Sequence, residues 1–193
     1  RDLVRSRGLG DVYKRQNFDL SVFINGSYGN KVYNYLSMKL THMNSPWTNQ
    51  LNAVNGRAQL VPINPNKVYE DGTMWYNDVS NVMVANPGAS IPRATINDPN
   101  DNDRISDRYI EDGSYIRLKN ISLGYTFPKK TIDKLGLSNL RIYANIQNLL
   151  TITGYDGYDP EIGASTSSVN VYGLDNGRYP SPTVYSFGLN VSF

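Results

Sequence analysis

The feature that most constrains the fold is a two-residue period of apolar side chains. In the stretch TVYSFGLNVSF, residues 183–193, every second residue from Tyr185 to Phe193 is apolar, and the residues between them are small or polar. Successive side chains of a β-strand point to opposite faces, so this stretch predicts a strand with one apolar and one polar face. Either a protein core or lipid must cover the apolar face.

The same period occurs in residues 17–29, 114–128 and 140–153, which gives four predicted strands. The stretch 114–128 is less regular in its first half, because Arg117 and Lys119 fall in phase with the apolar Ile121. The 15 Tyr and 16 Gly of the chain also favour strands over helices.

Residues 1–16, RDLVRSRGLGDVYKRQ, differ from the rest of the chain. They are basic and lack a strand period, and they resemble a translated adaptor sequence of the kind fused to open reading frames from environmental DNA. We expect a non-native or disordered tail here and expect residues 17–193 to carry the fold, with the N-terminal part of the parent protein missing.

Composition excludes several classes of site. The chain has no Cys, so disulfides and Cys-based sites are absent, and its single His, His42, cannot form a His-based catalytic or metal cluster. A net charge of +2 does not suggest a nucleic-acid partner. No run approaches the roughly 20 apolar residues of a membrane helix, whereas a barrel strand needs only about 9–11 residues.

The connections between the predicted strands are very unequal. A short segment that Pro128 and Gly136 bracket, with one or two helical turns, joins the second strand to the third. Long polar loops, at about residues 35–108 and 154–182, join the other pairs. If the strands alternate in direction, both long loops lie at one end, as in transmembrane barrels with long extracellular loops.

The polar stripes are rich in Asn, Ser, Gly, Gln and Thr, which suits a hydrated barrel interior better than the outer face of a sandwich. Periodicity alone leaves two alternatives open: a segment of a lipid-facing barrel, or a soluble β domain.

Several long motifs carry a family resemblance. The stretches SDRYIEDGSYIRLKNISLGYTFP, NLRIYANIQNLLTITGYDGYDPEIG and GLDNGRYPSPTVYSFGLNVSF resemble the closing segments of SusC/RagA-type TonB-linked outer-membrane proteins. NGSYGNKVYN and IPRATINDPNDNDRISD resemble segments upstream in the same family. The resemblance extends over residues 17–193 in family order.

The resemblance implies an all-β fold, the last four strands of a transmembrane β-barrel of about 22 strands. It implies a fragment of a transporter in the outer membrane of Bacteroidetes-type bacteria, importing oligosaccharides or peptides. The implied partners are a SusD-type surface lipoprotein, TonB through the missing N-terminal part, the barrel assembly machinery and outer-membrane lipid. It implies no cofactor.

Candidate substrate or partner contacts lie in the loops. Aromatic platforms and charged groups suit sugar rings, but the family also uses such loop motifs for packing. The candidates are Trp47, Trp75, Tyr155, Tyr158, Tyr172 and Arg178.

Three further residues have expected roles in the barrel. Arg141 and Gln147 are expected to face the lumen, and the aromatic terminal residue Phe193 matches the family's barrel-assembly signal.

Two other classes of function are weaker. The acids of DPNDNDRISD, Asp98, Asp101, Asp103 and Asp107, lack the Gly and bidentate Glu of a calcium loop, so calcium is a minor alternative. No coherent set of acid, base and nucleophile suggests an enzyme. The alternative function is a soluble carbohydrate-binding β domain.

Overall fold

The computed structural model describes residues 5–98, 100–161 and 173–193, and the chain divides into two compact units. One unit comprises residues 1–34 and 110–193, and the other comprises residues 35–109. None of the helices in the described ranges is long and apolar enough to cross a membrane.

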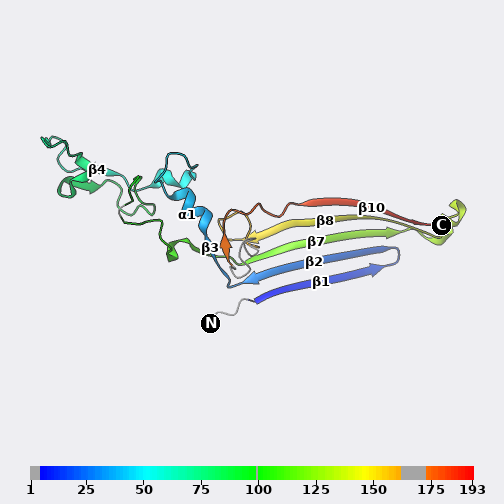
Figure 1. Cartoon of the computed structure of the whole chain (residues 1–193). Coiled ribbons are helices and arrows are strands. Elements are labelled where there is room, and N and C mark those ends of the chain that lie inside the picture. The colour runs from blue at the N-terminus through cyan, green and yellow to red at the C-terminus, as the bar shows by residue number, and fades with distance from the viewer. Residues whose placement is uncertain (1–4, 99, 162–172) are drawn as a thin grey trace. The chain divides into compact units, whose positions relative to one another are not determined.

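A five-stranded antiparallel sheet dominates the first unit, in the order β1-β2-β7-β8-β10 (Figure 1). Its strands are β1 (Arg5–Arg15), β2 (Phe18–Tyr28), β7 (Tyr115–Thr126), β8 (Asn139–Thr153) and β10 (Val184–Ser192). The four strands predicted from the apolar period are therefore present, adjacent in chain order and antiparallel. The helical turns predicted between Pro128 and Gly136 are α2 (Lys129–Ile132) and η5 (Asp133–Leu135), which end at Gly136 with a φ of 70°.

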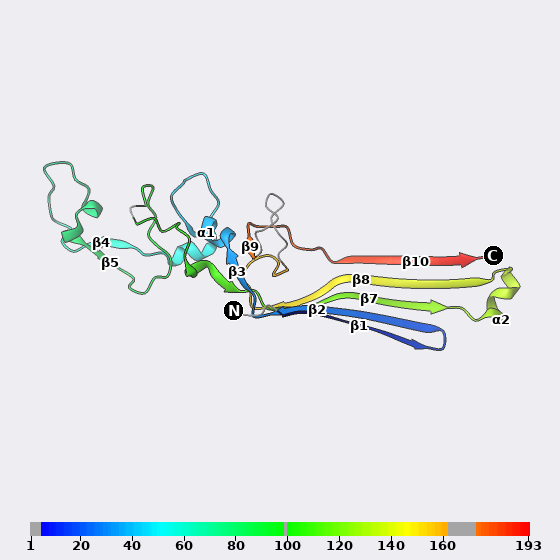
Figure 2. The ribbon, with the colours of Figure 1, turned by 60° about the horizontal axis from the view of Figure 1, so that its bottom comes forward.

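The register places both long connections at one end of the sheet, because Ser27, Tyr115 and Thr153 lie opposite one another across β2, β7 and β8. The short connection through α2 leaves from the other end, as Figure 2 shows. The expected sorting of loops by length is thus confirmed within this sheet.

A one-residue bulge in β7 explains the irregular half of that strand. Pairing with β2 and with β8 skips Lys119, so Ile121 and Leu118 share one face although they are three residues apart. A bulge adds one residue and shifts the alternation. Arg117, which the simple period puts among the apolar residues, therefore lies on the polar face with Asn120 and Ser122.

Residues 5–15 correct one expectation. They form β1, paired with β2 along its full length, so a disordered tail is wrong for this stretch. The pairing places Asp11 opposite Val22 and Arg15 opposite Phe18, so charged residues enter the apolar face of the sheet there. An adaptor origin for residues 1–16 stays a prediction.

A small sheet, in the order β6-β3-β9, completes the strands of the first unit. It contains β3 (Lys31–Asn34), β6 (Ile110–Asp112) and β9 (Leu174–Asp175), and β3 runs parallel to β9.

Short elements and loops build the second unit. Two short strands pair as a hairpin, β4 (Leu60–Pro62) and β5 (Val82–Val84). The helical segments are α1 (Tyr35–Thr41), η1 (Asn52–Gly56), η2 (Trp75–Asn77), η3 (Val79–Asn81) and η4 (Asp107–Tyr109).

Candidate functional site

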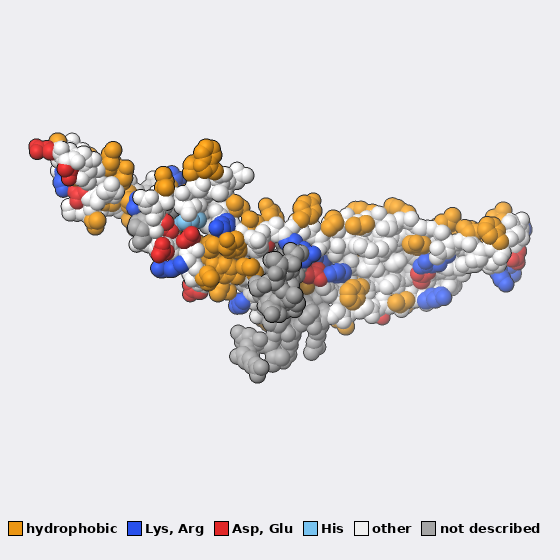
Figure 3. Space-filling model, in the orientation of Figure 1, with side chains coloured by type: hydrophobic (Ala, Val, Ile, Leu, Met, Phe, Trp, Pro, Cys, Tyr) orange, Lys and Arg blue, Asp and Glu red, His pale blue; other side chains and the backbone are white. Residues whose placement is uncertain are grey.

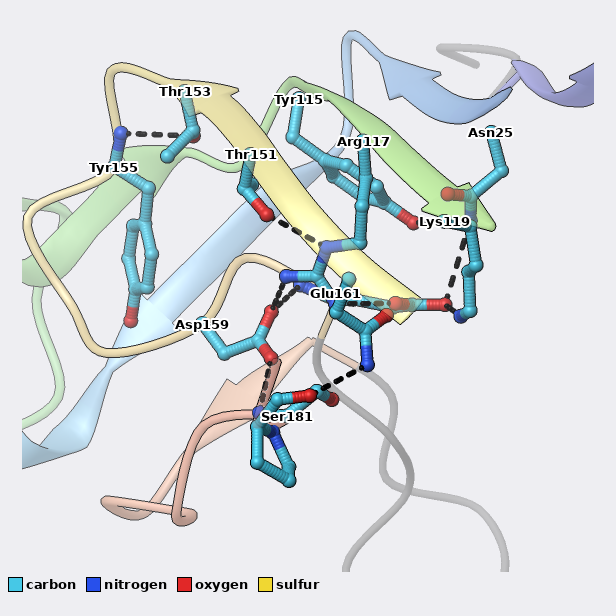
Figure 4. Close-up of polar contacts among 12 residues, drawn as sticks. Asn25, Tyr115, Arg117, Lys119, Thr151, Thr153, Tyr155, Asp159, Glu161 and Ser181 are labelled. Atoms are coloured by element: carbon cyan, nitrogen blue, oxygen red, sulfur yellow. Dashed lines mark hydrogen bonds and ion pairs between the residues drawn. The ribbon is translucent and has the colours of Figure 1, made fainter. Parts of the chain in front are cut away.

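The polar face of the large sheet carries a cluster of charged residues where β8 continues into its long loop (Figure 4). The bulge brings Arg117 to this face, where its Nε donates a hydrogen bond to the Thr151 hydroxyl at 2.8 Å. Its two terminal nitrogens bind two loop carboxylates: Nη2 pairs with Asp159, and Nη1 lies 2.6 Å from Glu161 Oε2. One arginine thus ties the loop to two strands of the sheet.

Lys119, the bulged residue, adds a second cation to this cluster. Its ammonium pairs with the other oxygen of Glu161, and Asn25 of β2 donates a hydrogen bond to the same oxygen at 3.4 Å. We call the ion pairs of Arg117 and Lys119 with Asp159 and Glu161 the loop clasp.

The ion pair of Arg117 with Asp159 is shielded from solvent, whereas Lys119 is 36% exposed. The side chain of Arg117 is 4% exposed and that of Asp159 is 9% exposed. Burial alone would raise the pKa of Asp159, but hydrogen bonds from Arg117 and from the backbone amides of Ser181 and Glu161 outweigh it and hold this pKa below its usual value. Asp159 is therefore a carboxylate at neutral pH and serves as an anchor.

A second anchor holds the beginning of the same loop. The Tyr155 hydroxyl donates a hydrogen bond of 2.6 Å to Asp175 Oδ2, and the Gly177 amide binds the other oxygen at 2.8 Å. Burial and this hydrogen bond to a carboxylate raise the pKa of Tyr155. Gly157 is needed beside the ring, because a Cβ there would collide with Tyr155.

The loop candidates therefore separate into two groups. Tyr155 is buried as a packing residue, whereas Tyr158 is 62% exposed and Arg178 is also exposed. Tyr172 lies outside the described residues. For the motif YDGYDPE, these contacts support the packing role that the resemblance offered as one alternative.

The two residues expected to face the lumen both lie on the polar face of the sheet. Arg141 binds Asp19 across the intervening strand β7, with distances of 2.6 Å from Nη2 to Oδ2 and 3.1 Å from Nε to Oδ1. Gln147 lies between Asn120 and Val184 in register, with an exposed side chain. Phe193 is 93% exposed and follows β10 in phase with the apolar face.

The two tryptophans of the second unit differ in setting. Trp47 is 92% exposed, whereas Trp75 is half-buried in η2 and lines a cavity.

His42 has a carboxylate partner that the sequence did not reveal. Its Nε2 lies 2.9 Å from Asp98 Oδ2, and one ligand atom each of His42, Asp98 and Asp103 lie within 4.8 Å of one another. The exclusion of any His-based cluster was therefore too strict. Asn102 also donates hydrogen bonds to both oxygens of Asp98, from its backbone amide to Oδ2 and from its side-chain amide to Oδ1.

Sequence reasoning missed the role of Arg117, although the signal was present. A cation in the apolar phase of a strand is unfavourable in lipid and in a protein core alike, and a bulge resolves that conflict.

The relatives found by comparison with known sequences are TonB-dependent receptors. No family model matches the chain. It is 32% identical over 191 residues to the TonB-dependent receptor P3 of Formosa agariphila, covering 96% of this chain and 16% of the relative. It is 36% identical over 93 residues to the TonB-dependent receptor SusC of Bacteroides thetaiotaomicron, covering 47% of this chain and 8% of SusC.

Solved structures show the same fold. The RagAB peptide importer in its closed-closed state matches with a TM-score of 0.61 at 19% identity, over 98% of this chain and 17% of the neighbour. The open-open state of that importer matches with a TM-score of 0.60 at 20% identity, over 98% of this chain and 17% of the neighbour. The chain spans about one sixth of the length of receptor P3 and of the RagAB chain, and the match to SusC covers 8% of that protein.

Proposed function

Because this chain is a homologue of the SusC/RagA-type TonB-dependent receptors, we propose that it is the C-terminal barrel segment of an outer-membrane transporter. The transporter imports oligosaccharides or peptides together with a SusD-type surface lipoprotein. The relatives are receptors, in agreement with the expectation that the chain is not an enzyme.

The two-faced sheet is the observation that carries this proposal. One face carries apolar side chains on adjacent strands that have no protein cover within the described residues: Phe187 is 83% exposed, Leu189 60% and Ile152 63%. On the side of the sheet that Figure 3 shows, few side chains in the middle are hydrophobic (orange), and most of the surface is white, the colour of backbone and of uncharged polar side chains. Apolar-out and polar-in alternation is the pattern of transmembrane barrels.

The two ends of the sheet differ, and this difference supports an orientation of the barrel segment in the outer membrane. Both long connections leave one end, which we assign to the cell exterior, where a lipoprotein partner and substrate are met. Phe193 lies at the other end, where the assembly machinery reads the final strand. TonB acts through the receptor's N-terminal part.

Spin labelling tests the assignment of the two faces. The chain has no Cys, so Ile142→Cys and Asn145→Cys introduce single label positions on opposite faces of β8. The labels are measured in the complete receptor that contains residues 17–193, reconstituted in lipid vesicles, with the unsubstituted receptor as background. Oxygen concentrates in lipid and a charged nickel chelate in water, so relaxation by each reports the surroundings.

We expect the label at position 142 to be reached by oxygen and the label at position 145 by the nickel chelate. A label at position 142 that neither reagent reaches would mean that protein covers the apolar face. Recovery of the receptor in the aqueous fraction of cells would equally contradict the proposal and favour the soluble carbohydrate-binding domain.

A further inference from the structure

The second unit contains a cavity of about 920 Å³. Three segments of this unit line it: residues 57–60, 75–77 and 93–97. Its size lies within the range of about 300–1,000 Å³ that is typical of small-ligand sites.

Backbone hydrogen bonds fix the first wall of the cavity. The Ala58 amide donates to the Ile91 carbonyl at 2.9 Å, and the Ala85 amide donates to the Gln59 carbonyl at 2.8 Å. The Asn86 side chain binds this segment from both directions, donating to the Arg57 carbonyl at 2.9 Å and accepting from the Gln59 amide at 2.8 Å. Arg57 therefore projects from a segment that its neighbours hold in place.

Two aromatic residues form the second wall. Trp75 and Tyr76 lie in η2 with ring centroids 5.7 Å apart and an interplanar angle of 80°. The short helix packs against β4 and β5. Tyr76 is 45% exposed and Trp75 is half-buried, so aromatic surface remains for a ligand.

The charge of the lining is entirely positive. Arg57 and Arg93 are its charged residues, both are half-buried, and no Asp or Glu is among the residues that line the cavity. The Arg57 guanidinium donates to the Val54 carbonyl at 3.3 Å, and neither arginine forms an ion pair with a described residue. Two guanidinium groups beside aromatic rings are suited to bind an anionic group such as a carboxylate or a sulfate through charge-assisted hydrogen bonds.

We infer that this cavity recognises an anionic saccharide. Arg57 and Arg93 bind its carboxylate or sulfate group, while Trp75 and Tyr76 contact the apolar face of a sugar ring. This inference deepens the proposed function, on which it rests, because it assigns a substrate class to one part of the loop region.

Calorimetric titration of the complete receptor in detergent micelles tests the inference. The probes are an oligogalacturonate and its methyl ester, a sulfated oligogalactan and its desulfated form, and oligoglutamate as an acidic peptide. We expect at least one acidic glycan to bind at least ten-fold more tightly than its neutral counterpart, with affinity falling as salt rises.

Matched variants assign the effect to the cavity. Arg57→Gln and Arg93→Gln should each weaken binding of the acidic glycan about ten-fold, as expected for loss of one charge-assisted hydrogen-bonding group. Arg93→Lys keeps the charge and should weaken it less. Arg104→Gln, an exposed arginine of the same unit outside the cavity, is the control and should leave binding unchanged.

Three results would overturn the inference: equal affinity for charged and neutral glycans, tighter binding of oligoglutamate than of any glycan, or unchanged binding in both glutamine variants. Outer-membrane location and uptake are measured separately. A receptor that resides in the outer membrane and takes up a glycan, yet gives one of these three results, would refute the anionic site while leaving the proposed function intact.

Discussion

Gly124 lies beneath the ion pair that Arg141 and Asp19 form across β7. A Cβ at this position would collide with the Arg141 guanidinium and with both carboxylate oxygens of Asp19. The glycine is therefore required by the close approach of a charged pair that links the two neighbouring strands.

Gly124→Ala should disrupt this ion pair. Both partners are about a quarter exposed, at 26% and 25%, so we expect a loss of about 1 kcal/mol in the free energy of unfolding. Urea unfolding of the complete receptor in lipid vesicles, followed by tryptophan fluorescence, measures the change. Gly154→Ala is the control, because a Cβ there meets no atom within 4 Å. Equal stability of the two variants would contradict this role for Gly124.

The two-residue period of a strand predicts on which face of the sheet a side chain lies, but not which residue it contacts. Alternation correctly assigned Asp19, Arg141 and Gln147 to the polar face, since facing depends only on position within a strand. Their partners depend on register, and the ion pair joins residues 122 positions apart, which no local pattern reveals. For the same reason the cavity arginines of the second unit did not stand out in the sequence.

The first described part of the loop after β8, residues 154–161, is held at two places, by Tyr155 and by the clasp. Arg117→Met should open the clasp, because it leaves Asp159 buried without its cation. Removing one partner of a buried ion pair costs about 3–5 kcal/mol. Hydrogen exchange of the amides in residues 155–161 of the complete receptor should rise correspondingly.

Two variants accompany that measurement. Lys119→Met removes a cation that is 36% exposed, so we expect a loss of only about 0.5 kcal/mol. The double variant Arg117→Met with Asp159→Asn should lose less than the sum of the single variants, because the second change removes the unpaired charge. Additive losses would show that the two residues act independently.

The clasp should also respond to acid in a defined direction. Because the pKa of Asp159 is held below its usual value in the folded protein, its stabilising contribution is present above the unfolded value of 3.8 and is lost as pH falls through the lower folded value. A nitroxide at Tyr158→Cys should therefore keep an immobilised spectrum from pH 7 to about pH 4 and sharpen only below it. Sharpening between pH 7 and pH 5 would contradict this assignment.

At the element scale, the sequence predicted the four strands, the placement of both long connections at one end, and the helical turns between Pro128 and Gly136. Apolar periods of 9 to 15 residues are long enough to define a strand. The clasp was not predicted, because it depends on a bulge, and a period of two assumes that no extra residue interrupts the pairing.

The two outer strands of the large sheet, β1 and β10, each have one neighbour among the described strands. Unpaired backbone groups cost several kcal/mol each in hydrocarbon, and exposed strand edges promote association. The chain alone should therefore not form a stable monomer in a bilayer.

Refolding the isolated chain into lipid vesicles tests this expectation. We expect chemical cross-linking to give oligomers and circular dichroism to show no cooperative thermal transition, with the complete receptor as the control. A cooperative monomer would contradict this expectation.

For the whole molecule, the family resemblance, which several motifs carry together, predicted more than the two-residue period did. The period alone left lipid and a protein core as alternative surroundings of the apolar face.

The extra residue in β7 divides that strand at Lys119 into two parts whose side chains alternate in opposite phase. One side of the junction presents odd-numbered residues to the apolar surroundings and the other presents even-numbered ones. If the strand paired without skipping Lys119, it would alternate regularly along its whole length, and Arg117 would then lie on the apolar side, away from its carboxylates. The presence of a bulge can therefore decide whether a charged residue of a strand reaches a loop, with no substitution at that residue itself.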